Sequence, residues 1–249
     1  MIINLLGTGT CIPSLERASS SVWVRSEKRE LLLDAGTGCM RRLLESGGDP
    51  GNIDGIILTH FHPDHSSELV PILFYLKCGS FLKEKNFSVM GGAGLNKFYD
   101  KLYSAYGKWI KPAFKLHLIE LEKNNFVFGD MIINVFCVNH RPESIALKLT
   151  DSKGKIFVFS GDMDVTEGFS DFCRGADLLV IESSFTDGRK IPGHLTPSEA
   201  ADIAKLAGLE KIVLTHFYPE AGGTDFLENA RKIFKGEIIL GSDLMEIVL

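Results

Sequence analysis

Short apolar runs recur along most of the chain, and many of them end at Gly, Asn or Asp. They are rich in Ile, Val, Leu and Phe, the composition expected of β-strands. We therefore predict ten strands. These lie at Met1–Leu6, Ser20–Val24, Glu30–Asp34, Gly55–Thr59, Met131–Val138, Ser144–Thr150, Lys155–Ser160, Leu178–Glu182, Lys211–Thr215 and Gly236–Leu240.

Helical patterns fall between some of these runs. Apolar residues repeat at helical spacing within Asp64–Lys77. Gly38–Ser46 follows a glycine turn, and Ala221–Lys235 has a weaker helical pattern. A longer amphipathic repeat runs from Leu95 to Tyr106 and combines apolar and aromatic residues. The pattern predicts a helix in each of these segments.

The helix predicted over Pro197–Ala207 has the clearest start signal. Thr196 is placed as its N-cap, Pro197 occupies the first helical position, and Glu199 lies three residues beyond the cap. Strands dominate the whole pattern and helices are interspersed among them. This predicts a layered α/β (α+β) arrangement, which we expect to form one domain over residues 1–249.

Composition excludes several classes of protein. The chain has 249 residues, a net charge of −5 and 45% hydrophobic residues, so disorder and coiled coil do not describe it. No apolar stretch approaches the roughly 18 residues needed to cross a bilayer, and we expect no membrane association. Five cysteines without CxxC spacing indicate reduced thiols in a cytoplasmic protein. The mild acidity counts against a protein that coats nucleic acid.

The segment Lys77–Lys115 differs from the rest of the chain. It holds eight lysines against two acidic residues, and eight aromatic residues. An ordinary surface helix with a buried aromatic face would explain this composition. A surface for an anionic ligand, RNA or a partner subunit would explain it as well. The sequence leaves both interpretations open.

The strongest chemical signal is the sequence His60-Phe61-His62-Pro63-Asp64-His65, directly after a predicted buried strand. Imidazole and carboxylate groups are the ligands that a zinc-like ion takes outside cysteine sites. One ion can rarely use all four ligands from so short a loop, so the spacing predicts two neighbouring ions. The alternative is a chance cluster of histidines on a solvated loop.

Three other apolar strands also deliver a His or Asp at their carboxyl ends: His140, Asp162 and His216. Sites in α/β proteins collect at such strand ends. Each of these residues alone is more often an ordinary surface residue. Together they predict a set of seven metal ligands, which comprises His60, His62, Asp64, His65, His140, Asp162 and His216.

This pattern resembles the HxHxDH signature of the metallo-β-lactamase superfamily, with the later ligand motifs in the same order. The resemblance implies an αββα sandwich with two metal ions at one edge, held by two groups of three ligands and bridged by Asp162. The groups would be His60, His62 and His140 for the first ion, and Asp64, His65 and His216 for the second. Asp34 matches an early aspartate of the family, which orients a ligand; the alternative is a turn residue after a strand.

Further motifs resemble the ribonuclease Z branch of that superfamily. They include the early Leu6-Gly7-Thr8-Gly9-Thr10 and the late Ser242-Asp243-Leu244. The resemblance implies that His194, supported by Glu182, protonates the leaving group, and that Asp64 acts in catalysis as well. The alternative for His194 is an ordinary loop residue.

Two departures from ribonuclease Z bear on the substrate. Only 22 positions separate His140 from Asp162, which leaves no room for the long arm that grips tRNA in that family. The family's Arg-Asn pair near the amino end becomes Arg17-Ala18. Armless relatives include small-molecule phosphodiesterases, such as the enzyme that opens phosphoribosyl cyclic phosphate in phosphonate breakdown.

We therefore expect a hydrolase with two divalent ions, zinc before manganese or iron, that cleaves a small or cyclic phosphodiester. The first alternative is a ribonuclease Z-type endonuclease that uses Lys77–Lys115 to bind RNA. A thioester, lactone or β-lactam hydrolase is the second, and a binding module on a decayed site is the third. The resemblance also implies a homodimer.

Overall fold

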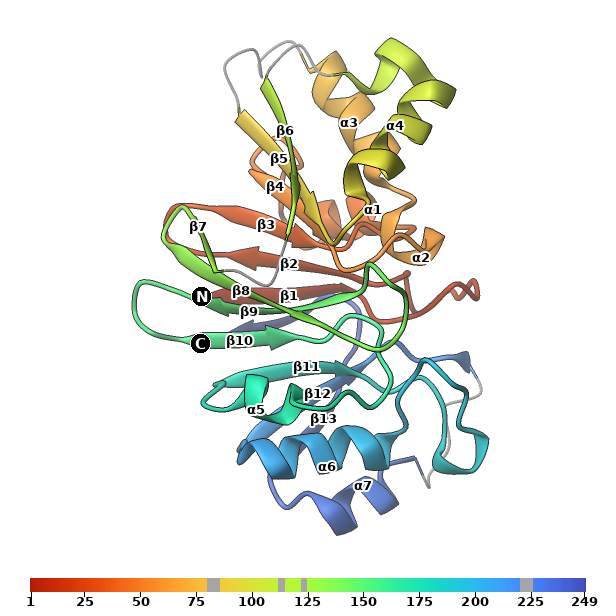
Figure 1. Cartoon of the computed structure of the whole chain (residues 1–249), viewed down its shortest axis with the longest axis vertical. Helices are drawn as coiled ribbons and strands as arrows, with labels where there is room; N and C mark the ends of the chain where they lie inside the picture. The colour runs from red at the N-terminus through yellow and green to blue at the C-terminus, as the bar shows by residue number, and fades with distance from the viewer. Residues whose placement is uncertain (80–85, 112–114, 122–124, 220–225) are drawn as a thin grey trace.

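The computed structural model describes residues 1–79, 86–111, 115–121, 125–219 and 226–249. Two mixed sheets pack face to face, and helices cover the outer face of each (Figure 1). This is the αββα sandwich that the resemblance to the metallo-β-lactamase superfamily implied.

The first sheet has seven strands in the order β14-β1-β2-β3-β4-β5-β6. β14, β1, β2 and β3 pair antiparallel, and β3 to β6 run parallel. Its strands are β1 (Ile2–Gly7), β2 (Ser21–Arg25), β3 (Glu30–Leu33), β4 (Gly55–Leu58), β5 (Asn86–Gly91), β6 (Lys115–Glu120) and β14 (Met245–Val248).

The second sheet also has seven strands, in the order β13-β12-β11-β10-β9-β8-β7. β7 to β10 pair antiparallel, and β10 to β13 run parallel. Its strands are β7 (Phe126–Phe128), β8 (Met131–Cys137), β9 (Ile145–Thr150), β10 (Ile156–Phe159), β11 (Leu178–Glu182), β12 (Lys211–Thr215) and β13 (Glu237–Leu240).

Helices from the first part of the chain pack on the first sheet and those from the last part pack on the second (Figure 1). The first set is α1 (Cys39–Glu45), α2 (Pro63–Ser66), α3 (Leu69–Cys78), α4 (Leu95–Tyr106) and the 3₁₀ helix η1 (Gly107–Ile110). The second set is α5 (Phe169–Cys173), α6 (Pro197–Ala207) and α7 (Glu228–Ile233), with the 3₁₀ helix η2 (Asp187–Arg189).

The central core lies between the sheets. Successive residues of β4 point to opposite faces, so that Ile57 packs between the sheets while Ile56 packs under the helices. Leu147 on β9 and Phe159 on β10 belong to the same buried cluster as Ile57, from the other sheet. Because parallel strands are buried on both faces, they have the unbroken apolar runs seen in the sequence.

The ten predicted strands are all present, with small shifts at their ends. The helix predicted over Asp64–Lys77 is wrong as a single element, because it is divided into α2 and α3. Pro71 has no N–H with which to continue a helix from Ser67. Glu68 lies at the break, where its carboxylate accepts hydrogen bonds from the backbone N–H of Gly38 and Met40.

Four strands were not predicted: β5, β6, β7 and β14. Three of them, β6, β7 and β14, are edge strands, and polar side chains interrupt the apolar pattern of β6 and β14. The basic segment 77–115 thus contributes β5 and the start of β6 to the first sheet, besides α4.

The amphipathic helix α4 is only partly covered. Leu95 and Tyr99 are buried, but Tyr103 and Tyr106 are exposed. The predicted helix Ala221–Lys235 is present as the shorter α7, and its first five residues lie outside the described part. None of the helices in the described ranges is long and apolar enough to cross a membrane.

The inter-sheet core predicts a clear contrast between two leucines. Leu147 is fully buried between the sheets and Leu15 is fully exposed on a loop. Leu147→Ala should lower the free energy of unfolding by about 2–5 kcal/mol because it leaves a cavity. Leu15→Ala should change it by less than about 0.5 kcal/mol. Urea unfolding followed by circular dichroism measures both, and equal effects would contradict this description of the core.

Candidate metal centre

The seven predicted ligands lie together where strands of both sheets end. β4 leads into His60 and into α2, whose loop and first turn carry His62, Asp64 and His65. From the second sheet, His140 follows β8, Asp162 follows β10 and His216 follows β12. All seven are buried except His62 and His140, which are partly exposed. The two sheets therefore both contribute to one cluster.

The ligand atoms form two groups that meet at Asp162. The first contains His60, His62, His140 and Asp162, and the second contains Asp64, His65 and His216; within each group these atoms lie within 4.8 Å of one another. Oδ2 of Asp162 is 3.8 Å from His60 Nε2 and 3.9 Å from His140 Nε2. Its Oδ1 is 3.2 Å from His65 Nε2 and 3.3 Å from His216 Nε2. One carboxylate oxygen thus faces each group.

Hydrogen bonds fix the orientation of two imidazoles. Asp34 is buried after β3, and its Oδ2 lies 2.7 Å from Nδ1 of His65. Asp34 also accepts hydrogen bonds from the backbone N–H and the hydroxyl of Thr59. Nδ1 of His140 lies 2.8 Å from the carbonyl oxygen of Gly193. Both Nδ1 atoms therefore carry the proton, and both Nε2 atoms present a lone pair to the cluster.

A serine orients a third imidazole. Ser184 donates its hydroxyl proton to Glu182, at 2.6 Å, and accepts from Nδ1 of His216, at 2.9 Å. This leaves Nε2 of His216 without a proton. Nδ1 of His60 lies 3.1 Å from the hydroxyl of Thr59, so His60 also turns its Nε2 towards the cluster.

The imidazole nitrogens that face the cluster are suited to bind cations. Nε2 of His65 and Nε2 of His216 lie 3.3 Å apart, although the partners just described leave both with lone pairs. Nε2 of His140 and Nδ1 of His62 face each other at 3.2 Å. Within the described part of the chain, the buried Nε2 of His60 has no hydrogen-bond partner. Lone pairs as close as those of His65 and His216 repel one another unless a proton or a metal ion lies between them.

The charges of the buried carboxylates also favour a bound cation in the centre. Burial disfavours the charged form of Asp162, but His216 and His65 keep the pKa of its carboxyl well below the usual range. Burial also disfavours a charge on His65, yet Asp162 and Asp34 raise its pKa well above the usual value, so that a proton takes the place of the Nε2 lone pair where no cation is bound. His60 has a lowered pKa because of its burial and the neighbouring His65. The buried carboxylates therefore require positive charge beside them, which a metal ion can supply.

The backbone is unusual at the same place. Among the described residues, Asp34, His216 and Leu244 alone combine a side chain beyond glycine with a positive φ, and the first two belong to the centre. Gly161, with φ +57°, precedes Asp162, and a Cβ there would lie 2.7 Å from Cβ of Thr59. Such strain is characteristic of functional sites.

Glu182 and His194 form a pair next to the metal ligands. Glu182 is fully buried at the end of β11, and it accepts hydrogen bonds from the backbone N–H of Met163 and of Leu195. Nδ1 of His194 lies 3.2 Å from Glu182 and 4.0 Å from Asp162. Burial lowers the pKa of His194 and Glu182 raises it, with a net rise. Because Nδ1 is held by Glu182, proton exchange with a substrate falls to Nε2.

Sequence analysis missed three groups that hold the imidazoles: Thr59, Ser184 and the carbonyl of Gly193. Thr59 and Gly193 each directly precede a candidate site histidine, which is a weak signal. A backbone carbonyl carries no side-chain signal at all. Asp34, in contrast, was expected from the family resemblance to orient a ligand, and it contacts the candidate ligand His65.

Known proteins share this architecture. Residues 29–217 match the family described as the beta-lactamase superfamily domain. The metallo-β-lactamase fold protein YhfI of Bacillus subtilis is 29% identical over 246 residues, with 96% of each chain covered. Its crystal structure has a TM-score of 0.87 at 24% sequence identity, over 99% of this chain and 98% of that chain.

Proteins named for RNA processing are also similar. The short form of human tRNase Z has a TM-score of 0.80 and 27% identity, over 100% of this chain and 99% of that chain. Ribonuclease Z of Haloarcula marismortui is 27% identical over 304 aligned positions, which cover 99% of this chain and 96% of that protein. Since this chain has 249 residues, at least 55 of those positions lie opposite gaps in it. With a family match over most of its length and the two-sheet fold, the chain belongs to the metallo-β-lactamase superfamily.

Proposed function

We propose that the protein is a metal-dependent phosphodiesterase that acts on a small or cyclic phosphodiester. The observation that carries this proposal is the His194–Glu182 pair, in which Nδ1 of His194 lies 3.2 Å from Glu182 and 4.0 Å from Asp162, with His216 close by. A proton donor at this place suits a leaving oxygen that departs with negative charge. Acyl transfer from a thioester has less need of such a donor, since a thiolate leaves readily.

Two divalent ions would be held by the two ligand groups, with Asp162 shared between them. Zinc is the ion we propose, because imidazole and carboxylate ligands suit it, although such ligands also accept manganese or iron. When bound, the ions polarise the phosphodiester and lower the pKa of a water molecule so that it attacks at neutral pH.

The chain's own residues orient the ligands and donate the proton. Asp34, Gly193 and Ser184 hold the imidazoles in the tautomers that leave their Nε2 atoms free. Glu182 orients His194 and stabilises its protonated form, so that Nε2 donates a proton to the departing oxygen. We include Asp64 in catalysis because its Oδ2 lies 3.6 Å from Nε2 of His216.

The short connection between ligands favours a small substrate. The chain from His140 to Asp162 is occupied by the β9–β10 hairpin. The alignment with a ribonuclease Z also needs at least 55 positions that this chain lacks. We therefore do not expect the tRNA grip that the arm of ribonuclease Z provides.

We further propose one catalytic domain over residues 1–249, a homodimer and a cytoplasmic location. The first two rest on the family resemblance. The third rests on the cysteines, all five of which are free thiols.

The ligand set predicts a specific loss of metal. Wild type should bind about two zinc ions per chain, and Asp162→Asn should retain fewer because it removes the shared carboxylate charge. His117→Ala is the matched control, since His117 lies on β6 outside the ligand groups. Elemental analysis after dialysis measures the ratio. Equal zinc content in wild type and Asp162→Asn would contradict the shared-ligand role.

The His194–Glu182 pair predicts a dependence on the leaving group. His194→Ala should lower kcat by about 10²–10⁴-fold for a diester with an alkoxide leaving group, which needs protonation. For bis(p-nitrophenyl) phosphate the loss should be small, because nitrophenolate leaves without a proton. Steady-state kinetics on both diesters tests this, and an equal loss on both would contradict the acid role.

A ribonuclease Z-type endonuclease is the second candidate, favoured by exposed lysines on α4 and η1, which include Lys97, Lys101 and Lys108. Phe61, next to the ligands, stacks on Phe98 of α4 with 4.7 Å between ring centroids, so this helix borders the centre.

For the small-substrate proposal we expect weak RNA binding with little salt dependence. A steep slope, reduced by about 0.7 in each of Lys97→Ala and Lys101→Ala but not in the exposed Lys28→Ala, would favour the endonuclease instead. Fluorescence anisotropy with single-stranded RNA at several salt concentrations measures the slope.

A further inference from the structure

One loop carries both His194 and the carbonyl group that orients His140. It connects β11 to α6, over residues 183–196, and includes η2. The carbonyl oxygen of Gly193 accepts a hydrogen bond from Nδ1 of His140, at 2.8 Å. The next residue is His194, whose Nδ1 lies 3.2 Å from Glu182. The position of this short segment therefore affects a candidate metal ligand and the candidate acid together.

Gly193 lies directly against the imidazole of His140. Its φ is +93°, in the left-handed region that favours glycine. A Cβ atom at this position would lie 3.2 Å from Nδ1 of His140, which is closer than ordinary van der Waals contact. Because the backbone itself makes the contact, a small displacement of the loop moves the carbonyl oxygen away from Nδ1.

Asp164 holds the same glycine through its backbone N–H. Oδ2 of Asp164 accepts a hydrogen bond from the N–H of Gly193, at 2.8 Å. The backbone N–H of Asp164 donates to the carbonyl oxygen of Asn139, at 2.6 Å. Asn139 directly precedes His140. Asp164 therefore links the loop to the segment that carries His140, through its side chain and its backbone.

Lys190 joins Asp164 to helix α6. Its Nζ lies 2.7 Å from Oδ1 of Asp164 and 2.7 Å from Oε2 of Glu199. Glu199 also accepts a hydrogen bond from the backbone N–H of Thr196, in the capping box that begins α6. The side chains of Lys190, Asp164 and Glu199 are 28–31% exposed. Ion pairs with this exposure add little to the free energy of unfolding, so we expect the effect of Lys190 to be on the geometry of the loop.

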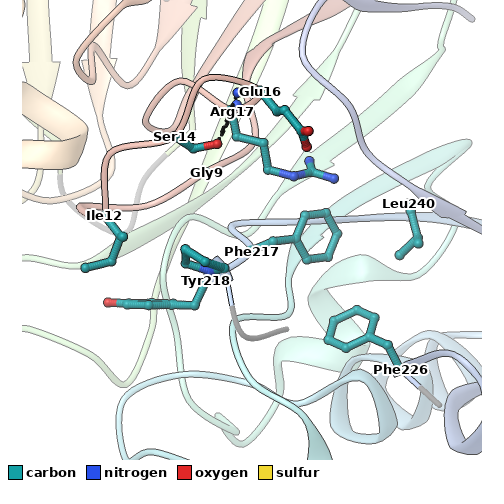
Figure 2. Close-up of a pocket in the computed structure, with 10 residues that line it drawn as sticks. Gly9, Ile12, Ser14, Glu16, Arg17, Phe217, Tyr218, Phe226 and Leu240 are labelled. Carbon is teal, nitrogen blue, oxygen red and sulfur yellow. Dashed lines mark hydrogen bonds between the residues drawn. The ribbon is translucent and has the colours of Figure 1, made fainter. Parts of the chain in front are cut away.

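The beginning of the loop is held by an aromatic contact. Phe185 stacks on Tyr218 with 4.4 Å between ring centroids. Figure 2 shows Tyr218 at the edge of a cavity of about 330 Å³, which Ile12 and Leu240 also line. Because the space beside this ring is not filled by protein atoms, the stacking contact restrains the start of the loop without fixing Gly193.

The middle of the loop has contacts of its own. Asp187, in η2, accepts hydrogen bonds from the backbone N–H and the hydroxyl of Ser198, at 3.2 and 2.7 Å. Ser198 belongs to the first turn of α6. These contacts precede Lys190 in the chain and do not involve it. Loss of the Lys190 ammonium should therefore release the segment around Gly193 and leave the rest of the loop in place.

We propose that Lys190 is a positioning residue of the metal centre. By joining Asp164 to α6, it keeps the carbonyl group of Gly193 on His140 and fixes the place of His194. The role for His194 rests on the proposed phosphodiesterase function, whereas the role for His140 depends only on metal binding.

Zinc affinity tests the contact with His140 without any substrate. Lys190→Met removes the charge and leaves a side chain of similar length, so one of the two zinc ions should bind about tenfold more weakly. Lys190→Arg should bind zinc within about threefold of wild type, because a guanidinium can also join two carboxylates. Competition with a chromogenic chelator measures both affinities. Unchanged zinc affinities in Lys190→Met would overturn the proposal.

Lys155→Met is the matched control. Lys155 forms a partly exposed ion pair with Asp177, at 2.9 Å, and it lies at the opposite end of β10 from Asp162. This variant should leave both zinc affinities unchanged, and circular dichroism should show the same fold in all variants. An equal loss of zinc affinity in Lys155→Met and Lys190→Met would show a general effect of lost ion pairs and overturn the proposal.

Kinetics at saturating zinc test the role for His194. In Lys190→Met, kcat should fall about tenfold for a diester with an alkoxide leaving group and stay within about threefold for bis(p-nitrophenyl) phosphate, because only the alkoxide needs a proton. KM should stay within about twofold for both diesters. Equal losses of kcat would overturn the role for His194. If wild type hydrolyses neither diester, the proposed function fails, and the zinc affinities still decide the role for His140.

Discussion

The buried charge of Asp162 is the constraint on which the rest of the centre depends. Its carboxylate lies between imidazoles from both sheets, with one oxygen facing each group of ligand atoms. A charge in such a place is costly unless opposite charge lies beside it. The imidazoles cannot all supply that charge, because burial and mutual repulsion favour the neutral form of His60. Cations between Asp162 and the histidines satisfy both requirements.

The fold surrounds Asp162 with imidazoles by bringing strand ends of both sheets together. β3 and β4 deliver Asp34 and His60 from one sheet, while β10 and β12 deliver Asp162 and His216 from the other. The apolar core between the sheets holds these ends at fixed separation. Hydrogen bonds to the outer nitrogens then set each imidazole, so the geometry of the ligands exists before any ion binds.

Sequence patterns predicted the central strands, and they marked candidate ligands that the structure brings together, for a physical reason. Buried parallel strands have unbroken apolar runs, and His60, Asp162 and His216 stand out because they directly follow such runs. The edge strand β6 was not predicted, because lysine and histidine alternate with its apolar residues and interrupt the apolar run. The predicted helix over Asp64–Lys77 is divided for two reasons. Pro71 lacks the N–H that would continue the helix, which the sequence shows. Glu68 accepts a hydrogen bond from the distant Gly38, which only the folded structure shows.

The supporting groups were harder to predict. Gly193 acts through its backbone carbonyl, and Ser184 is one serine among many. Ile12 and Leu240 line the same cavity, although no local pattern relates residues so far apart in sequence. Such features depend on packing between distant segments, which single-sequence patterns do not contain.

Anomalous X-ray diffraction at the zinc edge, on crystals grown with zinc, tests the central claim most directly. The account predicts two peaks about 3.5–4 Å apart, one in each ligand group, with Asp162 between them. A single peak that uses only one group, or no peak within contact of Asp162, would contradict it.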